Sequence, residues 1–78
     1  MPLLRVHLDS DRVTARRVMD LHRAGKTHHE SREAARAQAW RHGRTPVGEP
    51  IFVGVTNGRR HVQLLYDIEV DSDAQRSG

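Results

Sequence analysis

Side chains that could hold phosphate gather directly after one turn of the chain. Asn57-Gly58 separates two β-rich segments, and Arg59, Arg60 and His61 follow it. An arginine guanidinium binds a phosphate through paired hydrogen bonds, so this cluster could hold a nucleic-acid backbone or enter a groove. Charged side chains at this place would equally protect the edge of a short hairpin against aggregation. The sequence leaves both interpretations open.

A second basic group lies in the first half of the chain. Residues 1–44 carry ten basic and five acidic side chains, whereas residues 45–78 carry three basic and five acidic ones. Arg12, Arg16 and Arg23 are spaced to share one stripe of a helix. The twelve arginines and one lysine reflect either nucleic-acid binding or GC-rich coding. The net charge of +3 is too small to argue for strong non-specific binding.

Residues for metal binding or nucleophilic catalysis are not arranged in a specific pattern. The six histidines include no H-x-x-x-H pair, and His28 and His29 would point about 100° apart on a helix. No cysteine and no G-x-S-x-G motif is present. We therefore predict no metal, no cofactor and no catalytic residue, and favour binding over enzymatic activity.

Length and hydropathy indicate where the protein is located and whether it forms a dimer. No segment approaches a membrane-spanning length, and the N-terminus lacks a charged region followed by an apolar run. We expect a soluble, cytoplasmic protein without a membrane partner. A chain of 78 residues has a small apolar core, so we also expect a homodimer.

Local patterns predict a strand and two helices before the turn. Leu3–Asp9 alternates apolar and polar residues, which predicts a half-buried strand. Ser10 is the predicted N-cap of a helix that runs to about Ala24 and ends at Gly25.

The second predicted helix is rich in alanine. Thr27 and Glu30 fit a capping box at its start, and it should end near His42, before Gly43. Four alanines predict that this helix lies close to its neighbours, with Trp40 as its one large apolar residue.

The segments on either side of Asn57-Gly58 predict a C-terminal β-hairpin. A two-residue type I′ loop would place Val53 opposite Val62 and Ile51 opposite Leu64. The order β-α-α-β-β then predicts an α+β two-layer sandwich with two helices on one face of a three-stranded sheet. The predicted strand order is 1-3-2, with the first strand parallel to the third. We expect residues 1–70 to form one domain and residues 71–78 a flexible polar tail.

This register places Phe52 and Leu65 together on the outer, polar face of the sheet. They could be a scattered surface pair, a base-stacking platform, or a contact with a second copy or another protein. We predict the partner contact.

The order of a strand, a helical hairpin and antiparallel strands resembles the small RelE/ParE toxins of toxin–antitoxin pairs. A strand that begins with Gly-Arg and contains Leu-Tyr, in residues 58–66, adds to this resemblance. It implies cleavage of messenger RNA on the ribosome or inhibition of gyrase. Those toxins add a further strand that bears functional residues, and only residues 71–78 remain here, so no site residue is carried over.

Our leading hypothesis is a small, basic, non-enzymatic binding protein, dimeric, that contacts nucleic acid or a nucleoprotein in a regulatory role. Its predicted contact residues are Arg59, Arg60, His61, Arg12, Arg16 and Arg23. The alternatives are a RelE/ParE-like toxin and an inhibitor module that binds another protein through Phe52 and Leu65.

Overall fold

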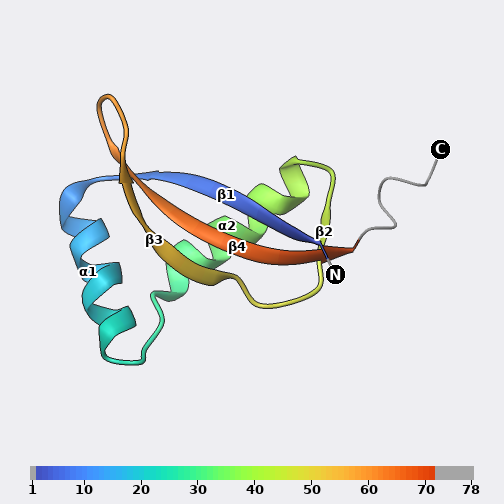
Figure 1. Cartoon of the computed structure of the whole chain (residues 1–78), viewed down its shortest axis with the longest axis horizontal. Helices are drawn as coiled ribbons and strands as arrows, with labels where there is room; N and C mark the ends of the chain where they lie inside the picture. Colours follow the sequence, from blue (N-terminus) through green and yellow to red (C-terminus); the bar gives the residue numbers. More distant parts are fainter. Residues whose placement is uncertain (1, 72–78) are drawn as a thin grey trace.

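The sheet is organised around one long strand near the C-terminus, and every other strand pairs with it. The computed structural model describes residues 2–71, and Figure 1 shows a twisted sheet with two helices. The elements are β1 (Leu3–Ser10), α1 (Arg12–Arg23), α2 (His29–Arg41), β2 (Thr45–Pro46), β3 (Ile51–Asn57) and β4 (Val62–Asp71). β1 and β3 pair with β4, and the short β2 pairs with its last two residues. The predicted α+β class is confirmed, with a four-stranded antiparallel sheet.

The direction of β1 differs from the prediction. β1 is antiparallel to β4, with Val6 opposite Tyr66 and Leu8 opposite Leu64. A helical crossover gives the strands that follow it the direction of the first, here β2 and β3, and the loop after β3 then reverses β4. β4 lies between β1 and β3, but it is antiparallel to both, and β2 joins it as well. The predicted order 1-3-2 is therefore matched only in part.

The core lies between the two helices and one face of the sheet. Its buried residues are Val6, Leu8, Leu64, Tyr66, Ile68 and Val70 from the strands and Ala15, Val18, Ala35 and Ala39 from the helices. Full burial of a Val, Leu or Ile side chain contributes roughly 1.5–3 kcal/mol, so these side chains hold the layers together. Ala35 and Ala39 are completely buried, and this confirms that α2 packs closely. Trp40 lies outside the core and is 59% exposed.

Both helices begin one residue later than predicted and end where predicted. The N-cap of α1 is Asp11 and not Ser10. The N-cap of α2 is His28, so the predicted capping box of Thr27 and Glu30 does not form. Gly25 and Gly43 follow the two C-caps with φ near +74° and +73°, the left-handed conformation that glycine adopts without strain.

The loop between β3 and β4 is longer than predicted. Asn57 pairs with Val62, which leaves residues 58–61 as a four-residue loop, and Gly58 donates its backbone N–H to the carbonyl of His61 at 2.7 Å. Neither Asn57 nor Gly58 has the positive φ of a type I′ turn. The observed register pairs Val55 with Leu64 on the helix-facing side, where the predicted one would have placed Arg60. Burial of apolar side chains therefore outweighed the local turn preference.

A β-bulge in β3 moves Phe52 to the inner face of the sheet. Phe52 lies opposite Tyr66 and Gly54 opposite Leu65, while Val53 between them has no partner on β4. One extra residue reverses the side-chain alternation, so Phe52 packs against the core and Ile51 is 62% exposed. The prediction that Phe52 faces outward is wrong. The predicted tail begins inside β4, since Asp71 is the last residue of that strand, and residues 72–78 lie outside the described residues.

Candidate nucleic-acid interface

The start of α1 and the loop between β3 and β4 enclose a polar cleft of about 370 Å³. It is lined by Ser10, Asp11, Arg12, Asn57, Gly58, Arg59, Arg60, His61 and Val62. Ser10 pairs with Val62 at the end of the β1–β4 ladder, and α1 begins directly after it. This pairing brings Arg12 beside Arg59, Arg60 and His61, although they are far apart in the sequence.

The arginines of this cleft have no ionic partner within residues 2–71. Arg12, Arg59 and Arg60 form no ion pair and no side-chain hydrogen bond among these residues. By contrast, Arg32 and Arg36 both contact Glu49, at 3.5 and 2.9 Å. The arginines therefore divide into a group paired within the fold and a group free to bind an anion.

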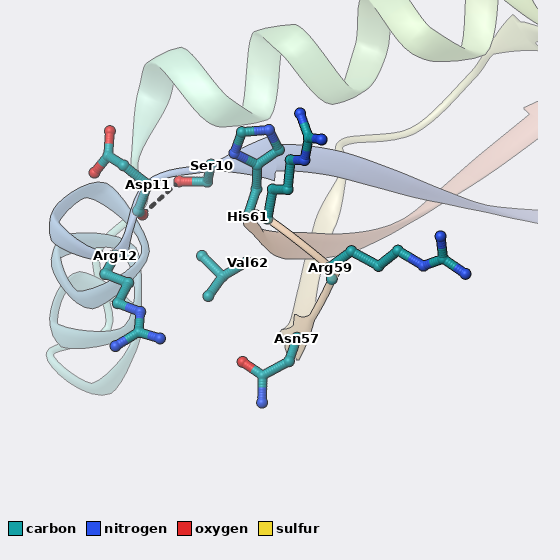
Figure 2. Close-up of a pocket in the computed structure, with 9 residues that line it drawn as sticks. Ser10, Asp11, Arg12, Asn57, Arg59, His61 and Val62 are labelled. Atoms are coloured by element: carbon teal, nitrogen blue, oxygen red, sulfur yellow. Dashed lines mark hydrogen bonds between the residues drawn. The ribbon is translucent and has the colours of Figure 1, made fainter.

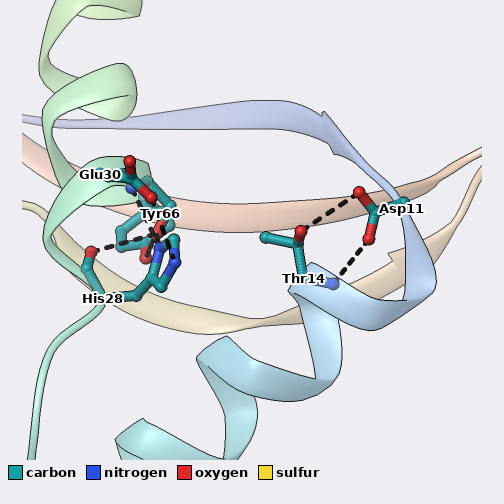
Figure 3. Close-up of polar contacts among 6 residues, drawn as sticks. Asp11, Thr14, His28, Glu30 and Tyr66 are labelled. Atoms are coloured by element: carbon teal, nitrogen blue, oxygen red, sulfur yellow. Dashed lines mark hydrogen bonds and ion pairs between the residues drawn. The ribbon is translucent and has the colours of Figure 1, made fainter.

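Asp11 is the acidic residue of the cleft lining, and its carboxylate is engaged at the start of α1. It accepts hydrogen bonds from the backbone N–H of Thr14 at 2.6 Å and from its hydroxyl at 3.1 Å, as Figure 3 shows. The backbone hydrogen bond is the main reason that the pKa of Asp11 is lowered. The cleft thus combines three arginines with one carboxylate that already has partners.

The side chains of the cleft do not converge on one point. Arg12 and Arg59 extend in different directions, as Figure 2 shows, and residues 59–61 are all exposed. Arg60 lies in the loop between β3 and β4 and not opposite Val55, which pairs with Leu64. An open array of guanidinium groups suits several phosphates along a backbone better than a single enclosed anion.

The other two predicted arginines lie farther along α1. Arg16 and Arg23 line a separate cleft of about 320 Å³ together with Met19 and Asp20. Arg16 has no ion pair within residues 2–71, whereas Arg23 lies 3.8 Å from Asp20. Both members of that pair are largely exposed, so the pair contributes little and leaves Arg23 available. The cleft and this stripe together form a basic surface along α1.

The predicted partner contact is divided between two faces. Leu65 lies on the outer face of the sheet, opposite His7 and Gly54, whereas Phe52 lies on the inner face. The apolar side chains that β3 exposes are Ile51 and Val53, at 62% and 44%. Sequence reasoning missed them, although a glycine within a strand is a signal for a bulge.

A further cleft, of about 320 Å³, lies between the loop that joins the helices and the start of β3. We call it the inter-helix cleft; it is lined by Val18, His22, Gly25, Lys26, Thr27, His28, Pro50, Ile51, Phe52 and Tyr66. The Phe52 ring makes edge contacts with the His22 ring at 5.2 Å and the Tyr66 ring at 5.5 Å. No local motif indicated this cleft, because the bulge of β3 brings Phe52 into it.

A buried hydrogen-bond network adjoins the inter-helix cleft. The Tyr66 hydroxyl lies 2.5 Å from Ser31 Oγ, which lies 2.9 Å from His28 Nδ1, and Figure 3 shows Tyr66 beside His28. Burial raises the pKa of Tyr66, since a phenolate would lose its hydration there. Tyr66 therefore belongs to the packing of α2 and is not a partner of His61 at the loop.

The described residues also bear on metal binding and on membrane-spanning helices. Within residues 2–71, no group of three histidine or carboxylate side chains is placed to hold a metal ion. Neither helix in that range is long and apolar enough to cross a membrane. Comparisons with protein-family models, curated proteins and solved structures found no match.

Proposed function

We propose that the protein binds nucleic acid, in a regulatory and non-enzymatic role, through a basic surface on the loop between β3 and β4 and along α1. This surface, here called the tip surface, consists of Arg12, Arg16, Arg23, Arg59, Arg60 and His61. The observation that carries the proposal is that Arg12, Arg59 and Arg60 share one cleft without an ionic partner in residues 2–71.

Phosphate is the ligand that this chemistry favours. Guanidinium groups that are exposed and unpaired can bind phosphate without first breaking an internal ion pair. Each neutralised phosphate releases counterions, so affinity should fall with salt by a slope of about 0.9 per contact on duplex DNA.

Binding is better supported than cleavage. The cleft supplies one imidazole, His61, and its carboxylate at Asp11 is engaged by Thr14. General acid–base cleavage needs a second group near the reacting oxygen. The toxin-like activity implied by the order of elements therefore has no specific observation in its favour.

The proposal includes a second copy of the chain on the outer face of the sheet. Phe52 is inside the fold, so the apolar contact would be made by Ile51, Val53 and Leu65. This arrangement leaves the tip surface of each copy open to nucleic acid.

The test is fluorescence anisotropy with labelled single-stranded RNA and duplex DNA between about 50 and 200 mM salt. Arg12→Ala and Arg59→Ala are compared with Arg41→Ala, an exposed arginine at the end of α2. In Figure 1 that end of α2 lies far from the loop between β3 and β4. We expect Arg12→Ala and Arg59→Ala each to reduce the salt slope by about 1 and Arg41→Ala to leave it unchanged.

Two results would overturn the proposal. One is the absence of binding to either ligand at the lowest salt concentration. The other is an equal loss in all three variants, which would indicate an effect of net charge without a defined surface.

A further inference from the structure

We propose that the inter-helix cleft receives one unstacked base of a single-stranded nucleic acid. This inference rests on the proposed function and extends it, because it specifies the form of the ligand and a second point of contact.

The walls of the cleft have the chemistry of a base-stacking site. The Phe52 ring lies between the rings of His22 and Tyr66, with centroid distances of 5.2 and 5.5 Å. Tyr66 is buried beneath, so His22 and Phe52 are the rings that a base could reach. Proteins bind unpaired bases by stacking them on aromatic side chains, and this contact tolerates any base. His22 is exposed, so its ring is accessible from solvent.

The cleft has room for a base. Its volume of about 320 Å³ lies within the roughly 300–1,000 Å³ that small-molecule sites span. A base within a duplex is stacked on both faces and would have to flip out before it could enter. Single strands meet this requirement without that cost.

Charge at the cleft fits a phosphate beside the bound base. Lys26 is exposed and forms no ion pair within residues 2–71, and no carboxylate is among the lining residues. The basic stripe of α1 ends at Arg23, just before the loop that contributes Lys26. α1 has 12 residues and is therefore about 18 Å long at 1.5 Å per residue. One strand could then contact the tip surface, follow α1 and place a base in the cleft.

The floor of the cleft is fixed by internal hydrogen bonds. The Tyr66 hydroxyl is held by Ser31, whose backbone N–H donates to His28 Nδ1 at 3.2 Å. A side chain that is already positioned loses little freedom when a ligand binds. The Tyr66 floor of the cleft is thus formed before a base arrives.

The test compares single-stranded DNA with an abasic strand of the same length, which keeps the phosphates and lacks the bases. Anisotropy measures both ligands with wild type, His22→Ala, Phe52→Leu and Lys26→Ala, and with His42→Ala, an exposed histidine at the end of α2, as the matched control. We expect wild type to bind the intact strand about 5- to 150-fold more tightly, the range that one stacked base provides.

The variants should separate base contacts from phosphate contacts. His22→Ala and Phe52→Leu should reduce affinity for the intact strand and leave affinity for the abasic strand unchanged. Lys26→Ala should weaken binding of both strands, and His42→Ala binding of neither. His22 and Lys26 are exposed, so their variants keep the test valid should Phe52→Leu fail to fold.

The outcomes distinguish this inference from the proposed function. Equal affinity for the intact and abasic strands would overturn the base site and leave phosphate binding intact. The base site would also be overturned if the preference for the intact strand persists in His22→Ala and in a Phe52→Leu variant that folds. That result would place the base elsewhere. No binding of either strand would overturn the base site, whereas the proposed function is overturned only if single-stranded RNA and duplex DNA also fail to bind.

Discussion

The side-chain hydroxyls of Ser31 and Tyr66 lie 2.5 Å apart and join the first turn of α2 to the inner face of β4. Ser31 is 7% exposed, and its hydroxyl also lies 3.2 Å from the carbonyl of His28. Each buried polar group in this set therefore has a partner, as a stable core requires. The contact holds the start of α2 against the sheet and forms one side of the inter-helix cleft.

Tyr66 should titrate above the usual range for tyrosine. Burial raises its pKa, so the phenol should stay protonated beyond about pH 10. It is the one tyrosine of the chain, which makes the phenolate absorbance near 295 nm a direct readout. A folded-state pKa above the unfolded value means that this contribution to stability is complete below about pH 10 and is lost as pH rises through the folded pKa. Titration of the urea-denatured protein is the control, and identical curves would contradict the expectation.

The hydrogen bond between Ser31 and Tyr66 should appear as a coupling energy. We expect Ser31→Ala to lower the free energy of unfolding by about 1–3 kcal/mol, because it leaves the buried Tyr66 hydroxyl without its partner. Tyr66→Phe should cost less, about 0.5–1.5 kcal/mol, because the Ser31 hydroxyl keeps its contacts with His28. The double variant should lose less than the sum, with a coupling of about 0.5–1.5 kcal/mol. Urea denaturation measures all four proteins. Strictly additive losses would show that the two hydroxyls do not interact.

The ion pair between Arg5 and Asp67 should make the free energy of unfolding depend on pH under acidic conditions. Arg5 donates from Nε to one carboxylate oxygen of Asp67 at 2.8 Å and from Nη2 to the other at 3.0 Å. The hydrogen bond from Arg5 is the main cause of the lowered pKa of Asp67. Because the pKa of Asp67 is lower in the folded than in the unfolded state, its contribution to stability is fully present above about pH 4. That contribution is lost as the pH falls through the pKa of the folded state.

The pair is partly exposed, with side-chain exposures of 53% and 20%, so we expect only a small effect on stability. Thermal melts of wild type and Asp67→Asn between about pH 2 and 7 should converge at the acid end. Glu69→Gln, on the same face of β4, is the control and should keep the acid dependence of wild type. A constant difference between wild type and Asp67→Asn at every pH would contradict the prediction.

Because of the bulge in β3, substitutions of the neighbouring residues Ile51 and Phe52 should differ strongly in their effect on the free energy of unfolding. Phe52 packs against the core, so Phe52→Ala should lower the free energy of unfolding by about 2–4 kcal/mol. Ile51 is 62% exposed, so Ile51→Ala should change the stability of the monomer by less than about 0.5 kcal/mol. Urea denaturation at low protein concentration tests both variants. A larger loss for Ile51→Ala would mean that the alternation of β3 is not reversed.

Local features of the sequence were sufficient for the class of fold and for most element boundaries. The alternation of Leu4, Val6 and Leu8 predicted the inner face of β1, and Gly25 and Gly43 predicted where the helices end. These features act over a few residues, through side-chain periodicity and backbone conformation, so they can be recognised without the rest of the chain. The helix starts were missed by one residue, because several neighbouring side chains could each serve as a cap.

The register of the strands and the composition of the clefts were decided by tertiary structure. The Asn57-Gly58 pattern predicted a two-residue loop, but the structure pairs Val55 with Leu64 and leaves residues 58–61 in solvent. The extra residue at Val53 then placed Phe52 inside, where it helps to form the inter-helix cleft. Arg12 lies beside the loop between β3 and β4 because Ser10 pairs with Val62 at the end of the sheet. Each outcome depends on which side chains can be buried against elements distant in the chain, and no short pattern contains that information.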